Sequence, residues 1–198
     1  MTPENIALDD RKEGKWNTLV GMIQEIPGLL IQFITHPLDF FQSLKGEPNH
    51  RRALLFSVFV GLVAVVVRFG IYLPKLPNPI VFGIVLVIFP VMIILINLST
   101  GYACYMGWKA LGSKEKYPAA HICVSYISLM IPLTVALNFY FEFWFAVLVN
   151  YLLAGFLYSV ASIKTHSIAP VKAITAIAIL SCVQLAFYFL VLASKTQS

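Results

Sequence analysis

The chain has 198 residues, of which 59% are hydrophobic and 12% are charged, and its formal net charge is +5. A soluble domain carries roughly 25% charged residues and does not tolerate long unbroken apolar runs on a water-facing surface. The composition therefore excludes an ordinary soluble domain. It predicts one all-α membrane domain with a short polar head.

The first 50 residues are predicted to stay outside the bilayer core. Residues 1–14 are polar and expected to be disordered, and no cleavable signal peptide is expected because no apolar segment follows the early charges. Residues 15–50 show the spacing of amphipathic helices, the second beginning at Pro37. These helices either lie in the membrane interface or pack on the domain's own cytoplasmic face. In the first case, four basic residues would contact anionic lipid headgroups: Lys15, Lys45, Arg51 and Arg52.

Residues 51–194 contain five apolar segments, each predicted to cross the bilayer as a helix. A segment such as 53–73 reaches about 31 Å at 1.5 Å per residue, which covers the hydrocarbon core. Prolines inside spans are tolerated because neighbouring helices re-satisfy the carbonyls that they free. The predicted five-helix bundle has spans at about 53–73, 80–105, 120–137, 141–163 and 171–193.

The basic residues predict the orientation of the bundle. With these five spans, eleven Lys and Arg residues fall on the N-terminal side and two on the other side. Cytoplasmic loops carry the excess of Lys and Arg. We therefore expect a cytoplasmic N-terminus and, with an odd number of spans, an external C-terminus.

Arg68 and Glu142 are the fully charged residues placed inside a span or at its edge. A charge at the helix centre costs about 2.5–3.5 kcal/mol and usually marks function or pairing. Arg68 is about five residues, roughly 8 Å, from the outer end of its span, and Glu142 is in the first turn of the fourth span. We predict that they pair in the outer half of the bundle. The alternative is that Arg68 extends to the outer headgroups and Glu142 lies in water.

Uncharged polar residues inside the spans are expected to hydrogen-bond between helices. The alternative is that they line a path for a substrate. Gly155 and Ser159 form a pair of small residues that lets another helix approach closely. The polar residues concerned are Asn97, Ser99, Thr100, His121, Ser125, Ser128, Asn150, Ser159 and Gln184.

The sequence contains no pattern typical of catalysis, such as GxSxG, a Walker-type loop or HExxH. Cys104, His121 and Cys123 lack the spacing and the fourth ligand of a metal site, and the three cysteines are expected to be buried thiols. We therefore predict no enzymatic activity, no cofactor and no metal. The orientation explains the net positive charge, so no nucleic-acid partner is expected.

Three segments together resemble the Yip-domain (Ypt/Rab-interacting) membrane proteins, especially their prokaryotic members. They are HPLDFFQSLKGEPN before the first span, ALGSKEKYPAAHICVSYISLMIPL at the third, and YLLAGFLYSVASIKTHSIAPVKAITAIAIL across the last two. The resemblance covers roughly residues 36–193. The matching positions are Pro37, Phe40, Phe41, Tyr126, Pro132, Tyr158, His166 and Lys172.

The resemblance implies a five-helix bundle with a cytoplasmic N-terminus in the inner membrane of a prokaryote, with a eukaryotic endomembrane as the alternative. PNHRRALL replaces the motif of the eukaryotic branch, which argues against GTPase binding. The function expected is a non-enzymatic scaffold or accessory subunit that binds protein or lipid partners. The alternatives are a small transporter or channel component that uses the intramembrane polar residues and, third, a membrane enzyme acting on lipid.

Overall fold

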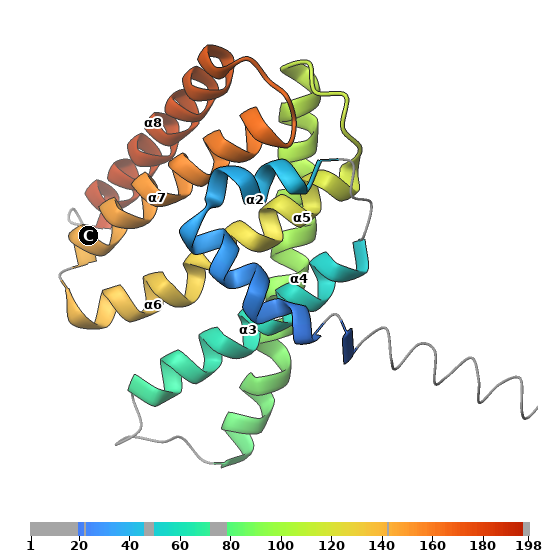
Figure 1. Ribbon diagram of the computed structural model, residues 1–198. Coiled ribbons are helices and arrows are strands. Elements are labelled where there is room, and N and C mark those ends of the chain that lie inside the picture. Colours follow the sequence, from blue (N-terminus) through green and yellow to red (C-terminus); the bar gives the residue numbers. More distant parts are fainter. Residues whose placement is uncertain (1–19, 22, 46–49, 72–78, 142, 196–198) are drawn as a thin grey trace, which may run out of the picture. The chain divides into compact units, whose positions relative to one another are not determined.

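The computed structural model describes residues 20–21, 23–45, 50–71, 79–141 and 143–195, and the chain divides into two units, residues 1–40 and 41–198. All regular secondary structure in the described ranges is α-helical, which confirms the predicted all-α class (Figure 1). The labelled helices are α2 (Pro37–Ser43), α3 (His50–Ile71), α4 (Pro79–Ala110), α5 (Tyr117–Ile127), α6 (Met130–Tyr140), α7 (Phe143–Lys164) and α8 (Pro170–Lys195).

The first unit contains a helix over residues 20–35, with position 22 outside the described residues, and the start of α2. Pro37 is the first residue of α2, a position where the missing N–H of proline costs no helical hydrogen bond. The Phe33 and Phe40 rings meet edge to face, with centroids 5.4 Å apart. Ile31 and Ile34 remain exposed on the helix over residues 20–35. The interfacial role of this segment stays a prediction.

Among the described residues of the second unit, four helical stretches are long and apolar enough to cross a membrane, which agrees with a membrane protein. They are His50–Phe69, Phe82–Ala110, Tyr117–Tyr140 and Phe145–Lys164. The fifth predicted span falls in α8, where the shorter stretch Pro170–Val183 is apolar over the residues with described side chains. The count of five therefore stays a prediction.

The stretch predicted as one span over 120–137 is broken into α5 and α6 between Ile127 and Met130. Pro132 has no N–H to donate to the Ser128 carbonyl, which instead accepts from Ile131 N at 2.9 Å. Leu129 N likewise donates to the Tyr126 carbonyl three residues back. Bonds of this spacing form a tight 3₁₀-type turn that redirects the chain.

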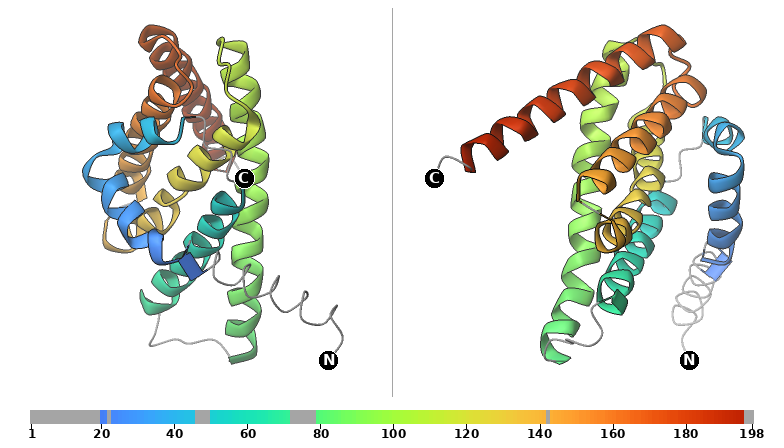
Figure 2. Two further views of the ribbon diagram at one scale, coloured as in Figure 1. Left: turned by 45° about the vertical axis from the view of Figure 1, so that its right-hand side comes forward. Right: turned by 90° about the vertical axis from the view of Figure 1, so that its left-hand side faces the viewer.

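Helix α5 lies at the centre of the second unit, with every residue from Ala119 to Ile127 buried. It packs against α3, α4 and α7, whereas α8 packs mainly on α7 and diverges from α4 (Figure 2). Helices α3 and α4 approach closely at Gly61, where an added Cβ would lie 2.6 Å from the Pro90 Cα. Glycine at position 61 is therefore required for this contact.

Candidate functional site

A buried polar cluster joins α3, α4 and α5. The Asn97 side-chain amide donates to Ser57 Oγ at 2.9 Å and to Ser128 Oγ at 3.0 Å. Ser57 Oγ also lies 3.2 Å from Ser125 Oγ, and all four side chains are buried. Each hydrogen bond between membrane helices adds about 0.6 kcal/mol. The amide thus reaches α3 and the turn after α5, and Ser57 reaches Ser125 of α5, so the cluster sets the register of the three helices.

Histidine and tyrosine side chains gather where α3 and α5 begin. His50 Nδ1 and His121 Nδ1 lie 3.0 Å apart, so one ring nitrogen donates and the other accepts. The Tyr117 ring lies parallel to His121, and its hydroxyl donates to the Leu98 carbonyl at 3.2 Å. Gly101 of α4 faces His121, and a Cβ there would lie 3.1 Å from the His121 Cα. The two imidazoles can share one proton and hold α3 against α5.

A second aromatic contact joins α4 to the loops at the same end of the unit. The His166 ring stacks on Trp108 with centroids 3.9 Å apart, and its Nδ1 hydrogen-bonds Ser113 Oγ at 3.0 Å. Trp108 Nε1 donates to Ser162 Oγ of α7 at 2.7 Å. Burial lowers the pKa of His166 from 6.5 to about 4, so the ring is neutral at neutral pH.

The loop after α7 holds the C-terminal end of α2. Thr165 Oγ1 donates to the Phe41 carbonyl at 2.6 Å and accepts from the Cys123 thiol at 3.5 Å. Lys45 Nζ donates to Ser167 Oγ at 2.8 Å. Lys45 is thus engaged with the protein itself. Headgroup binding by Lys45, Arg51 and Arg52 stays a prediction, and Lys15 lies outside the described residues.

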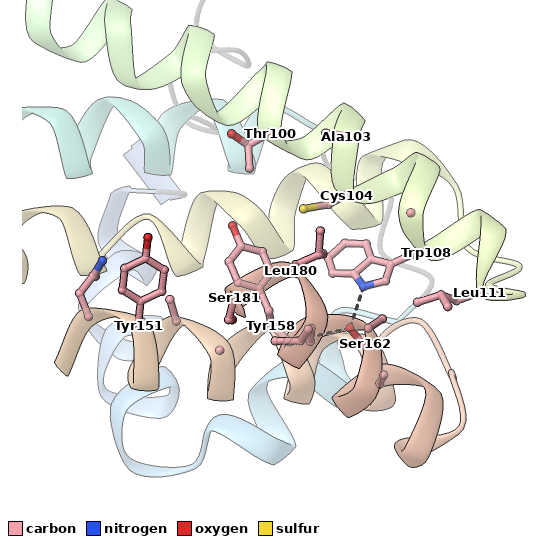
Figure 3. Close-up of a pocket in the computed structure, with 17 residues that line it drawn as sticks. Thr100, Ala103, Cys104, Trp108, Leu111, Tyr151, Tyr158, Ser162, Leu180 and Ser181 are labelled. Atoms are coloured by element: carbon pink, nitrogen blue, oxygen red, sulfur yellow. Dashed lines mark hydrogen bonds between the residues drawn. The ribbon is translucent and has the colours of Figure 1, made fainter. Parts of the chain in front are cut away.

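A pocket of about 570 Å³ lies between α4, α7 and α8, within the roughly 300–1,000 Å³ typical of ligand sites (Figure 3). Much of its wall is made of small or aliphatic residues: Ala103, Gly107, Leu111, Ala154, Gly155, Ala173, Ala176, Ile177 and Leu180. The pocket falls between helices whose outer faces are apolar, because Leu152, Phe156, Ile174 and Ile179 are exposed.

Polar side chains line the rest of this pocket. Tyr151 and Tyr158 of α7 both point their hydroxyl groups toward α4 (Figure 3). The remaining polar residues of the wall are Thr100, Cys104, Trp108, Asn150, Ser162 and Ser181. No Lys, Arg, Asp, Glu or His is among the lining residues. The pocket can therefore offer hydrogen bonds without a formal charge.

The predicted Arg68–Glu142 pair stays a prediction because Glu142 lies outside the described residues. Arg68 is in the last turn of α3 and is exposed. The alternative in which its side chain extends to the headgroups stays equally open.

The predicted interhelical residues divide between separate places. Asn97 belongs to the polar cluster, His121 to the histidine contact, and Asn150 to the pocket, where its Oδ1 accepts from Thr134 of α6 at 2.8 Å. Ser159 donates to the Gly155 carbonyl of its own helix at 2.8 Å. A Cβ at position 155 would lie 3.8 Å from Ile177, an ordinary contact distance between α7 and α8.

The positions that carry the family resemblance belong to several helices and to the loop after α7. Tyr126 is buried against Phe56, with ring centroids 4.2 Å apart, and Pro132 lies in the first turn of α6. Tyr158 lines the pocket, and Lys172 is exposed near the start of α8. The other positions are Phe41 in α2 and His166 after α7 in the second unit, and Pro37 and Phe40 in the first unit.

Several residues of these contacts were missed from the sequence. Ser57 and Ser162 could have been predicted to bond between helices, because each is a polar residue inside an apolar span, as Asn97 is. Trp108 and His50 could not, because an aromatic or histidine near a helix end is common in membrane proteins. Only the tertiary fold brings His50 to His121 across 71 positions of sequence.

Within the described part of the chain, no three His, Cys, Asp or Glu side chains come together in a group that could hold a metal ion. Comparison with known proteins finds no match to any family model, curated protein or solved structure. The Yip-domain resemblance therefore stays a prediction.

Proposed function

We propose that the chain is a non-enzymatic membrane scaffold or accessory subunit of the Yip-domain type, binding protein or lipid partners. The observation that carries the proposal is the use of the buried polar groups for contacts between helices. Asn97 bonds Ser57 and Ser128, and Trp108 bonds Ser162. These bonds make a fixed frame on which a partner can be held.

The separation of the polar residues supports a scaffold over a transporter. A path for a hydrophilic substrate needs a continuous polar lining across the bundle. Asn97 and His121 are buried in contacts between α3, α4 and α5, whereas Asn150 lines the pocket between α4, α7 and α8. Asn97 and His121 are thus not among the described residues that line the pocket with Asn150.

A second candidate function, a small transporter or channel component, is favoured by one observation. The pocket of about 570 Å³ brings Thr100, Asn150 and Tyr158 to one hollow between apolar helices. If water fills this hollow from one side of the membrane, it becomes part of an aqueous pathway.

Labelling of Cys104 distinguishes the two functions, because Cys104 lines the pocket. The full chain in vesicles is treated with a membrane-impermeant maleimide on each side, and modification at Cys104 is read by peptide mass spectrometry. A scaffold leaves Cys104 unlabelled from both sides until detergent is added. Labelling from either side would favour transport and contradict the scaffold. A Lys116→Cys variant, in an exposed loop position, provides the labelled control.

A further inference from the structure

We infer that the pocket between α4, α7 and α8 binds an uncharged lipid-soluble molecule that carries hydrogen-bond-accepting oxygen atoms. The inference deepens the proposed function, since it selects a lipid as partner and states its chemistry. It starts from the donors in the pocket wall.

The Tyr151 and Tyr158 hydroxyls are two of the donors in the pocket. Neither makes a hydrogen bond within the described residues, although both point into the hollow (Figure 3). The Asn150 side chain adds a polar amide to the same wall and hydrogen-bonds Thr134 Oγ1 at 2.8 Å. An unmet donor surrounded by apolar helices is costly, because lipid chains cannot accept a hydrogen bond. A ligand with acceptor oxygens removes this cost.

The spacing of the donors favours an elongated ligand. Tyr151 and Tyr158 are seven residues apart on α7, so they lie on one face about 10 Å apart along the axis. Between and around them the wall is formed by small residues such as Ala154, Gly155 and Ala176. Small side chains leave room for a hydrocarbon chain against the backbone.

The absence of formal charge in the lining determines the ligand class. No Lys, Arg, His, Asp or Glu is among the described residues that line the pocket, so a charged group placed there would be desolvated without a counter-ion from them. A charged headgroup therefore does not belong inside the pocket. An ester, ketone, ether or hydroxyl oxygen can accept a hydrogen bond from the tyrosine donors. A molecule that carries such an uncharged group remains soluble in the bilayer.

Trp108 provides the readout, because it lines the same pocket. The full chain carries Trp16→Phe and Trp144→Phe, so that only Trp108 fluoresces, and is placed in phosphatidylcholine vesicles. Two probes are compared: methyl 9,10-dibromostearate and 9,10-dibromooctadecane. Their bromine atoms quench tryptophan on contact, and only the first carries acceptor oxygens. We expect the ester to quench at lower concentration than the alkane.

The variant Tyr158→Phe removes one donor and keeps the ring. It should weaken ester quenching about fivefold, the change that one net hydrogen bond produces, and leave alkane quenching unchanged. The matched control is Tyr140→Phe, an exposed tyrosine that is not among the lining residues. A third variant, Ala176→Phe, fills the pocket and should abolish the advantage of the ester over the alkane.

Three results would overturn the inference: equal quenching by ester and alkane, no change in Tyr158→Phe, or the same loss in Tyr140→Phe. A change of oligomeric state in Ala176→Phe with ester quenching retained would also overturn it, because the pocket would then receive a protein helix. Cys104 labelling separates this test from the scaffold proposal. Failure of ester binding with Cys104 still protected would leave the scaffold intact.

Discussion

Two regions around α4 are built on different principles. In the first, α3 and α5 approach α4 closely, with Gly61 against Pro90 and the Asn97 amide bonded to two serines. In the second, α4, α7 and α8 leave a pocket of about 570 Å³ whose tyrosine hydroxyls bond no described residue. The difference indicates that the first region provides stability and the second is available for binding. Four predictions test this division, in order of decreasing effect.

Gly61→Val should cause the largest loss of stability. The first added carbon would meet the Pro90 backbone at 2.6 Å, and neither helix can yield without losing its packing. Overpacking of this kind costs about 3 kcal/mol or more. Unfolding of the purified chain in mixed micelles, followed by circular dichroism, measures the effect. A stability equal to that of the native chain would show that the contact is loose.

Acidification should destabilise the Trp108 end of the pocket through His166. The folded state holds the pKa of His166 at about 4, against 6.5 in an unfolded chain. Stability from this group is therefore fully present above pH 6.5 and is lost as the pH falls toward 4, because the unfolded state binds the proton first. The full loss is at most about 3 kcal/mol.

The His166 prediction is measured as the difference in unfolding free energy between the native chain and His166→Gln at several pH values. The two should converge as the pH falls from 6.5 to 4. A difference that stays constant over this interval would exclude His166 as the titrating group.

Asn97→Ala should lower the free energy of unfolding by about 2 kcal/mol, through the contacts between α3, α4 and α5. It removes two hydrogen bonds and leaves the buried Ser57 and Ser128 hydroxyls with fewer partners. Thr100→Val, one turn further along α4 in the pocket wall, is the matched control and should change stability by less than about 0.5 kcal/mol. Thermal unfolding of both variants measures the contrast. Equal losses would contradict the proposed division of roles.

Gly155→Ala should have the smallest effect. The added Cβ would lie 3.8 Å from Ile177, which is an ordinary van der Waals contact. Alanine is also the better helix former by about 1 kcal/mol, so stability should stay unchanged or rise slightly in the same unfolding assay. A loss comparable to that of Gly61→Val would show that α7 and α8 pack as tightly as α3 and α4.

The apolar helices could be predicted from the sequence more fully than the hydrogen-bond partners of the polar residues inside them. Long apolar runs predict helices of membrane length directly, and four such stretches are present among the described residues. Asn97 could be selected as a residue that bonds between helices, since a polar group inside a span needs a partner. Its partners Ser57 and Ser128 could not be assigned, because they lie 40 and 31 positions away.

The local break near Pro132 shows a similar limit. Proline inside a span was expected to be tolerated, but how the freed carbonyl would be satisfied depends on the neighbouring turns. The structure satisfies Ser128 O through Ile131 and divides the segment into α5 and α6. The pocket was not predictable at all, because its wall combines residues of α4, α7 and α8 that share no motif.

The sequence alone therefore determined the all-α class and the membrane-length apolar helices, because hydropathy and helix rise are local properties of the chain. The tertiary structure decided which polar groups meet. Asn97 hydrogen-bonds a serine of α3, whereas Tyr158 lines the pocket. Helices within a bilayer gain little from hydrophobic burial against one another. Small residues and hydrogen bonds between distant segments therefore determine how the helices pack. Such pairings depend on the whole fold and not on any one segment.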